Sequence, residues 1–93
     1  MEEKIMTLHP QGKTGVNISK AKYDMMRQAI INGLEAEGTM TFKALNEWVG
    51  GQLNGRFDGS IGWYYTTVKL DLEARGVLER VPKTSPQQIR LVD

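Results

Sequence analysis

The stretch SIGWYYTTVKLDLEARGVLER, residues 60–80, decides the fold. Its helical part carries apolar side chains at the spacing of one helix face: Ile61, Tyr65, Val68 and Leu72. Ser60 can cap the first turn of that helix, and Gly76 supplies the positive φ that ends it. The residues after the glycine are β-prone, so the pattern predicts a helix over 60–75 that leads into a strand.

Two further helices are predicted upstream, over 19–37 and 42–50. Their apolar stripes are Tyr23, Met26, Ile30 and Leu34 in the first and Phe42, Leu45 and Val49 in the second. Each has a capping candidate and a glycine stop: Ser19 with Gly38, and Thr41 with Gly50 and Gly51. Leu53 continues the second stripe, which leaves a frayed extra turn possible.

The flanking segments are less regular. Residues 39–41 are too short for more than a β-bridge, whereas residues 77–92 contain two β-prone runs around a Pro-bearing turn and predict a hairpin. Residues 1–18 are predicted to be an irregular N-terminal arm, because His9–Gly15 interrupts any pattern. Val16 and Ile18 flank Asn17 in a short alternation, so the end of the arm can lie extended on the domain. One domain is therefore expected over 19–93, preceded by this arm.

The order helix, bridge, helix, helix, hairpin is that of the winged helix-turn-helix. Residues 72–80, LEARGVLER, resemble the junction between recognition helix and wing in winged-helix transcription regulators. Residues 8–13, LHPQGK, and 63–73, WYYTTVKLDLE, are similar to segments of a family of small uncharacterised bacterial winged-helix proteins. The resemblance implies an α+β winged helix with three helices, a C-terminal hairpin wing and an N-terminal arm. It brings no activity with it.

The composition narrows the class of protein. A chain of 93 residues with 40% hydrophobic and 25% charged residues is typical of one small globular domain. It has no cysteine, which excludes disulfides and thiolate metal sites. The sequence has no apolar run long enough to predict a membrane span. Its acidic start, Met-Glu-Glu-Lys, is unlike a secretory signal, so a cytoplasmic location is expected. The net charge of +1 neither indicates nor excludes nucleic acid.

No catalytic or metal-binding set is visible. Gly12-Lys13-Thr14 is similar to the end of a phosphate-binding loop, but Thr7 stands where that motif needs a glycine. His9 is the only histidine and has no carboxylate beside it in the sequence. Asp71 and Glu73 are two positions apart on a helix, so they point to different faces and are expected to be solvated. We therefore expect no enzyme, no cofactor and no metal.

The outward face of helix 60–75 is the leading candidate for a binding surface. It is expected to present Trp63, Tyr64, Thr66, Thr67 and Leu70, with Lys69 at its border. In winged-helix regulators this face enters the major groove of duplex DNA. The leading hypothesis is therefore a small DNA-binding, transcription-regulatory protein. Its groove contacts would come from Trp63, Thr66 and Thr67, and its phosphate contacts from Lys69, Arg80, Lys83 and Arg90.

Two alternatives stay open for the same face. It lacks the Arg, Asn and Gln side chains that read bases, and it offers two aromatic residues and a leucine instead. Such a surface also suits a protein–protein interface, in which Trp and Tyr serve as anchors. In the third interpretation, Trp63 and Tyr64 simply pack under the glycine-rich loop over 50–59.

The apolar residues outside the three stripes bear on self-association. The arm and the first two helices hold more of them than one small core needs: Ile5, Met6, Leu8, Val16, Ile18, Ile31 and Trp48. We therefore expect a homodimer in which the arm and the first helix supply much of the contact. The alternative is a monomer whose arm folds back over its own third helix.

Overall fold

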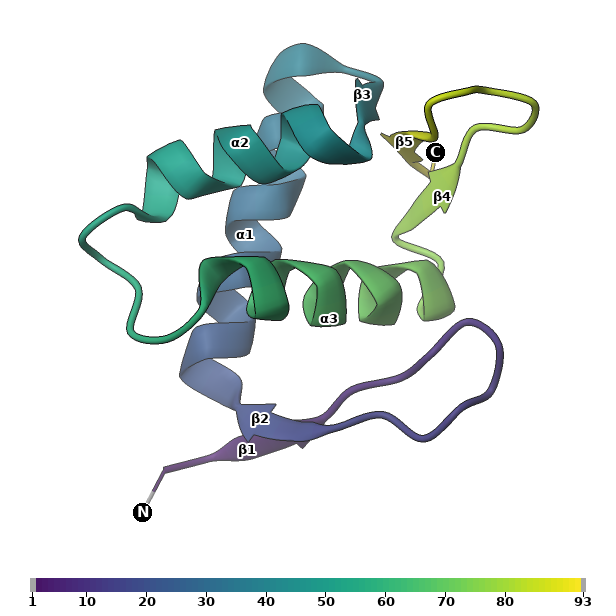
Figure 1. The fold of residues 1–93 in the computed structure, drawn as a ribbon. Helices are drawn as coiled ribbons and strands as arrows, with labels where there is room; N and C mark the ends of the chain where they lie inside the picture. The colour runs from purple at the N-terminus through teal and green to yellow at the C-terminus, as the bar shows by residue number, and fades with distance from the viewer. Residues whose placement is uncertain (1, 93) are drawn as a thin grey trace.

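The computed structural model describes residues 2–92, which contain three helices and five short strands. In chain order they are β1 (Lys4–Met6), β2 (Asn17–Ser19), α1 (Lys20–Glu37), β3 (Met40–Thr41), α2 (Phe42–Leu53), α3 (Ile61–Ala74), β4 (Leu78–Arg80) and β5 (Gln88–Leu91). In Figure 1, α2 and α3 lie side by side across α1, the β4–β5 hairpin follows the C-terminal end of α3, and β1 and β2 run beneath α3. The predicted α+β class is confirmed.

The helices begin and end close to the predicted positions because their caps form. The side-chain oxygens of Ser19, Thr41 and Ser60 each accept a hydrogen bond from the backbone N–H three residues later, at 3.3, 3.0 and 3.2 Å. At the other ends, Gly38 and Gly76 take φ values of 76° and 75°, which glycine adopts without strain. Both α1 and α3 therefore lie within one residue of their predicted limits.

The second helix is longer than predicted. An end was expected at Gly50 and Gly51, but α2 continues to Leu53. Leu53 is buried and extends the stripe of Leu45 and Val49 by one more turn. Each glycine disfavours the helix by about 1 kcal/mol relative to alanine, and burying a leucine contributes about 2 kcal/mol. The free energy gained by burying Leu53 therefore offsets the cost of placing two glycines in the helix.

The sheet joins the segment before α2 to the end of the chain. β5 lies between β3 and β4 and pairs antiparallel with both, with Met40 opposite Ile89 and Leu78 opposite Leu91. The predicted hairpin and bridge are confirmed. Fully buried side chains from the sheet and from all three helices share one core: Met26, Ile30, Leu45, Val49, Tyr65, Val68, Leu72, Leu78 and Ile89.

The N-terminal arm forms a hairpin of its own, so the prediction of an arm without regular structure was wrong. β1 pairs antiparallel with β2, Ile5 stands opposite Ile18, and the Thr7 N–H donates to the Val16 carbonyl at 2.8 Å. Ile18 is buried in the main core. The alternation at 16–18 did indicate an extended piece where β2 lies, but strands of three residues are too short for the sequence to predict β1 or the pairing.

The arm is tied to the helices through the carboxylate of Asp71, which is fully buried. This carboxylate accepts hydrogen bonds from the Leu8 N–H at 2.8 Å, from the Tyr23 hydroxyl, and from Arg75 Nε at 2.9 and 3.0 Å. The expectation that Asp71 and Glu73 are solvated was wrong for both side chains, which are 0% and 7% exposed. Their spacing places them on different helix faces, but it does not reveal what covers each face.

Replacing Gly51 by alanine is expected to stabilise the protein by about 0.5–1 kcal/mol. Alanine loses less backbone entropy in a helix, and a β-carbon at this position meets no atom within 4 Å. Chemical denaturation followed by circular dichroism measures the difference. Gly38→Ala is the matched control: a β-carbon there also has space, but the φ of 76° strains it, so stability falls. A Gly51→Ala variant no more stable than wild type would contradict this account of α2.

The stability should also fall at alkaline pH in a way that depends on Tyr23. Burial, together with the hydrogen bond to Asp71, raises the pKa of Tyr23 from 10.0 to about 12. The folded state therefore holds this proton more tightly than the unfolded state, and the resulting stability is complete below pH 10 and is lost as pH rises to about 12.

In Tyr23→Phe the free energy of unfolding should consequently depend less on pH across this range than in wild type. Urea unfolding at a series of alkaline pH values measures how steeply the free energy of unfolding changes with pH in each of the two proteins. Tyr65→Phe serves as the comparison, because burial also raises the pKa of Tyr65, but without a carboxylate partner. Identical slopes for wild type and Tyr23→Phe would show that Tyr23 does not carry the effect.

Candidate functional site

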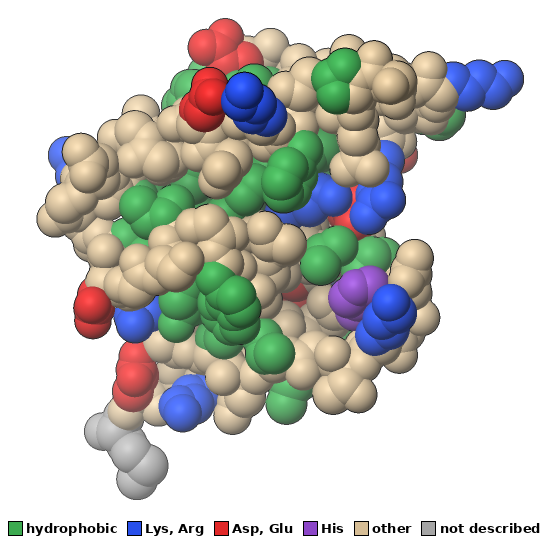
Figure 2. Space-filling model, in the orientation of Figure 1, with side chains coloured by type: hydrophobic (Ala, Val, Ile, Leu, Met, Phe, Trp, Pro, Cys, Tyr) green, Lys and Arg blue, Asp and Glu red, His purple; other side chains and the backbone are tan. Residues whose placement is uncertain are grey.

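The outward side of α3 is an uncharged ridge. We call it the α3 face and define it by Trp63, Thr66, Thr67 and Leu70. Trp63 is 47% exposed, Thr66 is exposed, and the other two side chains are partly buried. The Thr66 hydroxyl donates to the Gly62 carbonyl at 3.0 Å. Figure 2 shows hydrophobic side chains over this part of the surface, with basic and acidic side chains close together on the side of the hairpin.

Of the two aromatic residues expected on this face, only Trp63 lies there. The Tyr64 ring is half-buried and packs edge-on against Phe57, with 5.0 Å between ring centroids. The Trp63 ring packs edge-on against Tyr64 at 4.9 Å. Local packing under the loop before α3 thus accounts for Tyr64, whereas Trp63 is supported on one side and open to solvent on the other.

A groove runs along each side of the α3 face. The arm groove, of about 160 Å³, lies between α3 and the arm and is lined in part by Leu8, His9, Val16, Trp63, Thr67 and Leu70. The hairpin groove, of about 410 Å³, lies between α3, the start of α2 and the hairpin and is lined by Phe42, Thr66, Lys69, Leu70, Arg80 and Gln87. Leu70 lines both, so the ridge separates two adjoining grooves.

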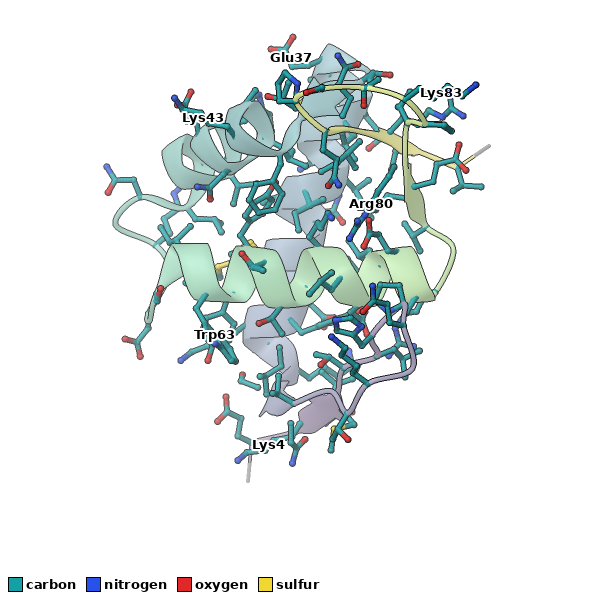
Figure 3. All side chains as sticks on the ribbon, turned by 45° about the vertical axis from the view of Figure 1, so that its right-hand side comes forward. Lys4, Glu37, Lys43, Trp63, Arg80 and Lys83 are labelled. Atoms are coloured by element: carbon teal, nitrogen blue, oxygen red, sulfur yellow. The ribbon has the colours of Figure 1, made fainter. Side chains whose placement is uncertain are left out.

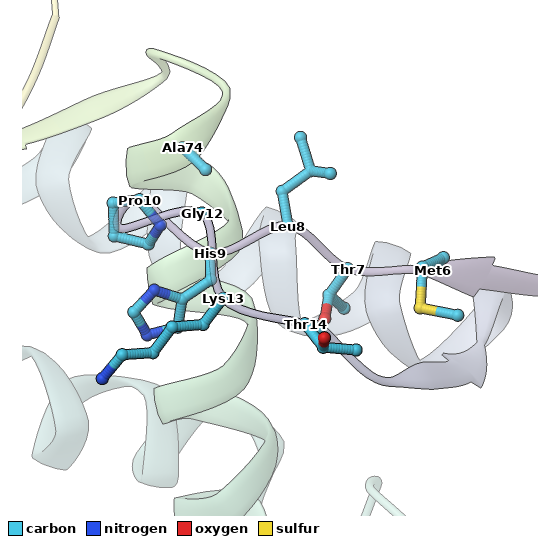
Figure 4. Close-up of a pocket in the computed structure, with 10 residues that line it drawn as sticks. Met6, Thr7, Leu8, His9, Pro10, Gly12, Lys13, Thr14 and Ala74 are labelled. Atoms are coloured by element: carbon cyan, nitrogen blue, oxygen red, sulfur yellow. The ribbon is translucent and has the colours of Figure 1, made fainter.

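The arm loop folds back over the chain's own α3. Figure 4 shows this loop, with Pro10 and Gly12, passing across the end of α3 at Ala74, where the hollow beneath it measures about 590 Å³. The loop closes only because residue 15 is glycine: a β-carbon there would lie 1.8 Å from the Thr7 carbonyl oxygen. The arm thus lies over the chain's own third helix, and both the homodimer and the monomer stay predictions.

The lone histidine serves the turn of the arm. His9 Nδ1 accepts a hydrogen bond from the Gln11 N–H at 3.1 Å. Between residues 2 and 92, no three His, Cys, Asp or Glu side chains gather as metal ligands would. None of the helices in that same range is long and apolar enough to cross a membrane.

Two of the four cations predicted to contact phosphate converge on Glu73. Lys69 Nζ donates to Glu73 Oε1 at 3.0 Å and to Gln87 Oε1 at 3.4 Å, and the Lys69 side chain is only 4% exposed. Arg80 Nε donates to the same carboxylate at 2.7 Å, with a second, longer contact at 3.5 Å. Figure 3 shows Arg80 between the hairpin and α3. One carboxylate therefore holds a cation from α3 and a cation from β4.

The pKa values of this cluster reflect burial opposed by charge. Burial lowers the pKa of Lys69, and the hydrogen bond and charge of Glu73 restore only part of it. Burial also raises the pKa of Glu73, but the hydrogen bonds and charges of Arg80 and Lys69 together outweigh it and leave that pKa below its usual value. The Glu73 carboxylate is thus held ionised. For the Lys69 ammonium, the free-energy cost of losing water exceeds what its hydrogen bonds and the charge of Glu73 give back.

The other two predicted phosphate contacts lie elsewhere on the hairpin. Arg90 Nε donates to Glu79 at 2.6 Å on the exposed sheet surface. Lys83 stands in the turn with a φ of 60°, and among residues 2–92 it makes no ion pair. In Figure 3 it points away from the molecule at the tip of the hairpin. The structure therefore does not bring the four cations together as one basic patch.

Sequence reasoning missed the roles of Asp71 and Glu73, although the sequence contains a signal for each. Glu73 follows Lys69 by four positions, and Arg75 follows Asp71 by four, which is the spacing of helical ion pairs. Phe42 and Gln87 were missed as groove residues because nothing local in the sequence indicates that α2 and the hairpin meet beside α3.

Replacing Glu73 by glutamine is expected to lower the free energy of unfolding by about 1–3 kcal/mol, because Lys69 then keeps its burial and loses its counterion. Urea unfolding at neutral pH measures the change. Glu79→Gln is the matched control: it removes an exposed ion pair and should change stability by less than about 1 kcal/mol. Equal effects of the two substitutions would contradict the assignment of Glu73 as the buried anchor.

No curated protein and no solved structure matches the chain. A family model matches residues 4–89, a range that begins at β1 and reaches into β5. The match thus takes in the arm as well as the three helices, and Asp71 and Glu73 both lie within it. The chain belongs to the Family of unknown function (DUF6958).

Proposed function

We propose that this chain is a winged-helix interaction module, which binds a segment of another protein across the α3 face. The element order supports the winged-helix assignment: helix, short strand, helix, helix and a hairpin whose second strand pairs with the short one. In that assignment α3 corresponds to the recognition helix and the β4–β5 hairpin to the wing. The proposed function is binding, with no catalytic step.

The observation that carries the proposal is the half-exposed Trp63 at one end of an uncharged ridge. Trp63 is held in place by Tyr64, so little side-chain entropy is lost when a partner covers it. Leu70 extends the apolar surface between the two grooves. Tryptophan is strongly enriched among the residues that dominate binding energies at protein interfaces. A protein segment laid along α3 would contact all of these groups.

The distribution of charge argues against duplex DNA as the first choice. A protein binds the DNA backbone by neutralising phosphates with lysine and arginine. Here Lys69 and Arg80 already share Glu73, and Arg90 is paired with Glu79. For Lys69, contact with a phosphate would also require leaving a nearly buried carboxylate. The α3 face itself offers no cation.

Duplex DNA is the second candidate function, and Lys83 is the observation that favours it. Lys83 is exposed at the hairpin tip and makes no ion pair within the described residues. In a winged-helix regulator that position would lie near the DNA backbone. Under this hypothesis Lys83→Ala should reduce the dependence of log affinity on log salt by about one.

Selection of a phage-displayed random peptide library against the whole chain tests the proposal. Selected peptides should bind wild type and lose about tenfold or more in affinity to Trp63→Ala, because truncating an interface tryptophan removes much of the binding energy. Met25→Ala is the control, since Met25 is similarly exposed, at 43%, but belongs to α1 rather than to the α3 face.

Random duplex DNA at about 50 mM salt is titrated in parallel. We expect that replacing Lys83 by alanine does not weaken any DNA binding that wild type shows. If no peptide is enriched, or if Trp63→Ala binds the selected peptides as well as wild type does, the interface proposal is refuted. DNA binding with a steep salt dependence that Lys83→Ala reduces would then establish the second candidate.

A further inference from the structure

We propose that the hairpin groove recognises a carboxylate: it takes an Asp or Glu side chain of the partner segment, with the neighbouring apolar side chain of that segment placed on Phe42 and Leu70. This inference deepens the proposed function and rests on it. The juxtaposition that carries it is two cations and an apolar wall around a single groove, with one carboxylate, Glu73, bound to both cations.

The first step is the charge balance of the groove. Lys69 and Arg80 bring two positive charges, and Glu73 brings one negative charge. The charged groups that act on Lys69 are Glu73 and Arg80, and Glu73 is the one that acts on Arg80. The remaining polar side chains of the groove, Thr66 and Gln87, are neutral. The groove therefore carries one positive charge that no described carboxylate balances.

The second step concerns free hydrogen-bond donors. Arg80 has five N–H groups and uses Nε and one terminal nitrogen on Glu73, while its side chain is 50% exposed. Lys69 Nζ has three donors, and one of its two polar contacts is the long one to Gln87 at 3.4 Å. Lys69 is only 4% exposed and its Nζ also lies 5.6 Å from the centre of the Phe42 ring, so it contributes charge to the groove. The unused donors that an incoming carboxylate would meet are those of Arg80.

The third step concerns the apolar wall. The Phe42 ring packs against Tyr65 with 4.9 Å between centroids, and the Tyr65 hydroxyl donates to the Phe42 carbonyl at 2.8 Å. Phe42 is therefore fixed before any ligand arrives, and Leu70 lines the same groove. The groove volume of about 410 Å³ falls in the range of sites that bind small groups. It accommodates an acidic side chain together with part of an apolar neighbour.

These features favour a carboxylate on a peptide over a phosphate on DNA. The groove supplies a single unbalanced positive charge, which an Asp or Glu side chain neutralises. A DNA backbone would instead bring a row of phosphates over Phe42 and Leu70, which offer them no hydrogen bonds. Apolar residues beside the acid, in contrast, bury surface against the same two side chains.

A matched pair of peptides tests the proposal by NMR titration of the ¹⁵N-labelled whole chain. The probes are acetyl-Ser-Ala-Glu-Leu-Phe-Ala-Ser-amide and its counterpart with Gln in place of Glu. We expect the Glu peptide to bind wild type about tenfold more tightly than the Gln peptide and to shift the amide signals of Leu70 and Gln87. In Arg80→Gln the two peptides should bind equally, whereas Arg90→Gln should keep the tenfold preference.

The Arg80→Gln variant should fold, because Lys69 and Glu73 remain as a balanced pair. Arg80→Lys should retain part of the preference for the Glu peptide, since it keeps the charge. Equal binding of both peptides to wild type overturns the carboxylate site. So does failure of both peptides to bind when library-selected peptides do bind. Neither result refutes the proposed function. If duplex DNA displaces the Glu peptide and Arg80→Gln abolishes DNA binding, the groove is a phosphate site and the carboxylate proposal is wrong.

Discussion

A carboxylate withdrawn from water needs donors for its oxygens, and Asp71 finds them on distant parts of the chain. The arm provides the Leu8 N–H, α1 provides the Tyr23 hydroxyl, and α3 itself provides Arg75. Removing any of these donors leaves lone pairs of a buried anion unsatisfied, which is far more costly than losing one ordinary contact. Together with Ile18 in the core, this side chain fixes the position of the arm and with it one wall of the arm groove.

Glu73 plays the corresponding role on the other flank of α3. Because it stands two positions after Asp71, its side chain points to a different side of the helix, where it binds Arg80 of β4. One acidic residue thus attaches the arm and the other attaches the hairpin. Between these two attachments the ridge from Trp63 to Leu70 stays uncovered. The arrangement explains why the exposed part of α3 is uncharged although the helix contains three charged residues.

The sequence predicts what depends on neighbours along the chain. The helix stripes, the caps at Ser19, Thr41 and Ser60, and the C-terminal hairpin all follow from local spacing. The arm hairpin and the buried acids do not, since Leu8 and Asp71 meet across 63 positions and three-residue strands have no visible period. Candidate binding residues were identified by type, but which of them are already paired with an acid is decided by tertiary contacts.

The separation of Leu8 from Asp71 also has a consequence for the order in which the chain folds. The β1–β2 hairpin and the i,i+4 pairs on α3 form between near neighbours, whereas the arm can dock only after α1 and α3 have come together. We therefore expect the arm to be the last segment to lock and the first to open. Its amide protons would then exchange through a local opening, at a rate faster than those of the helices, without requiring the core to unfold.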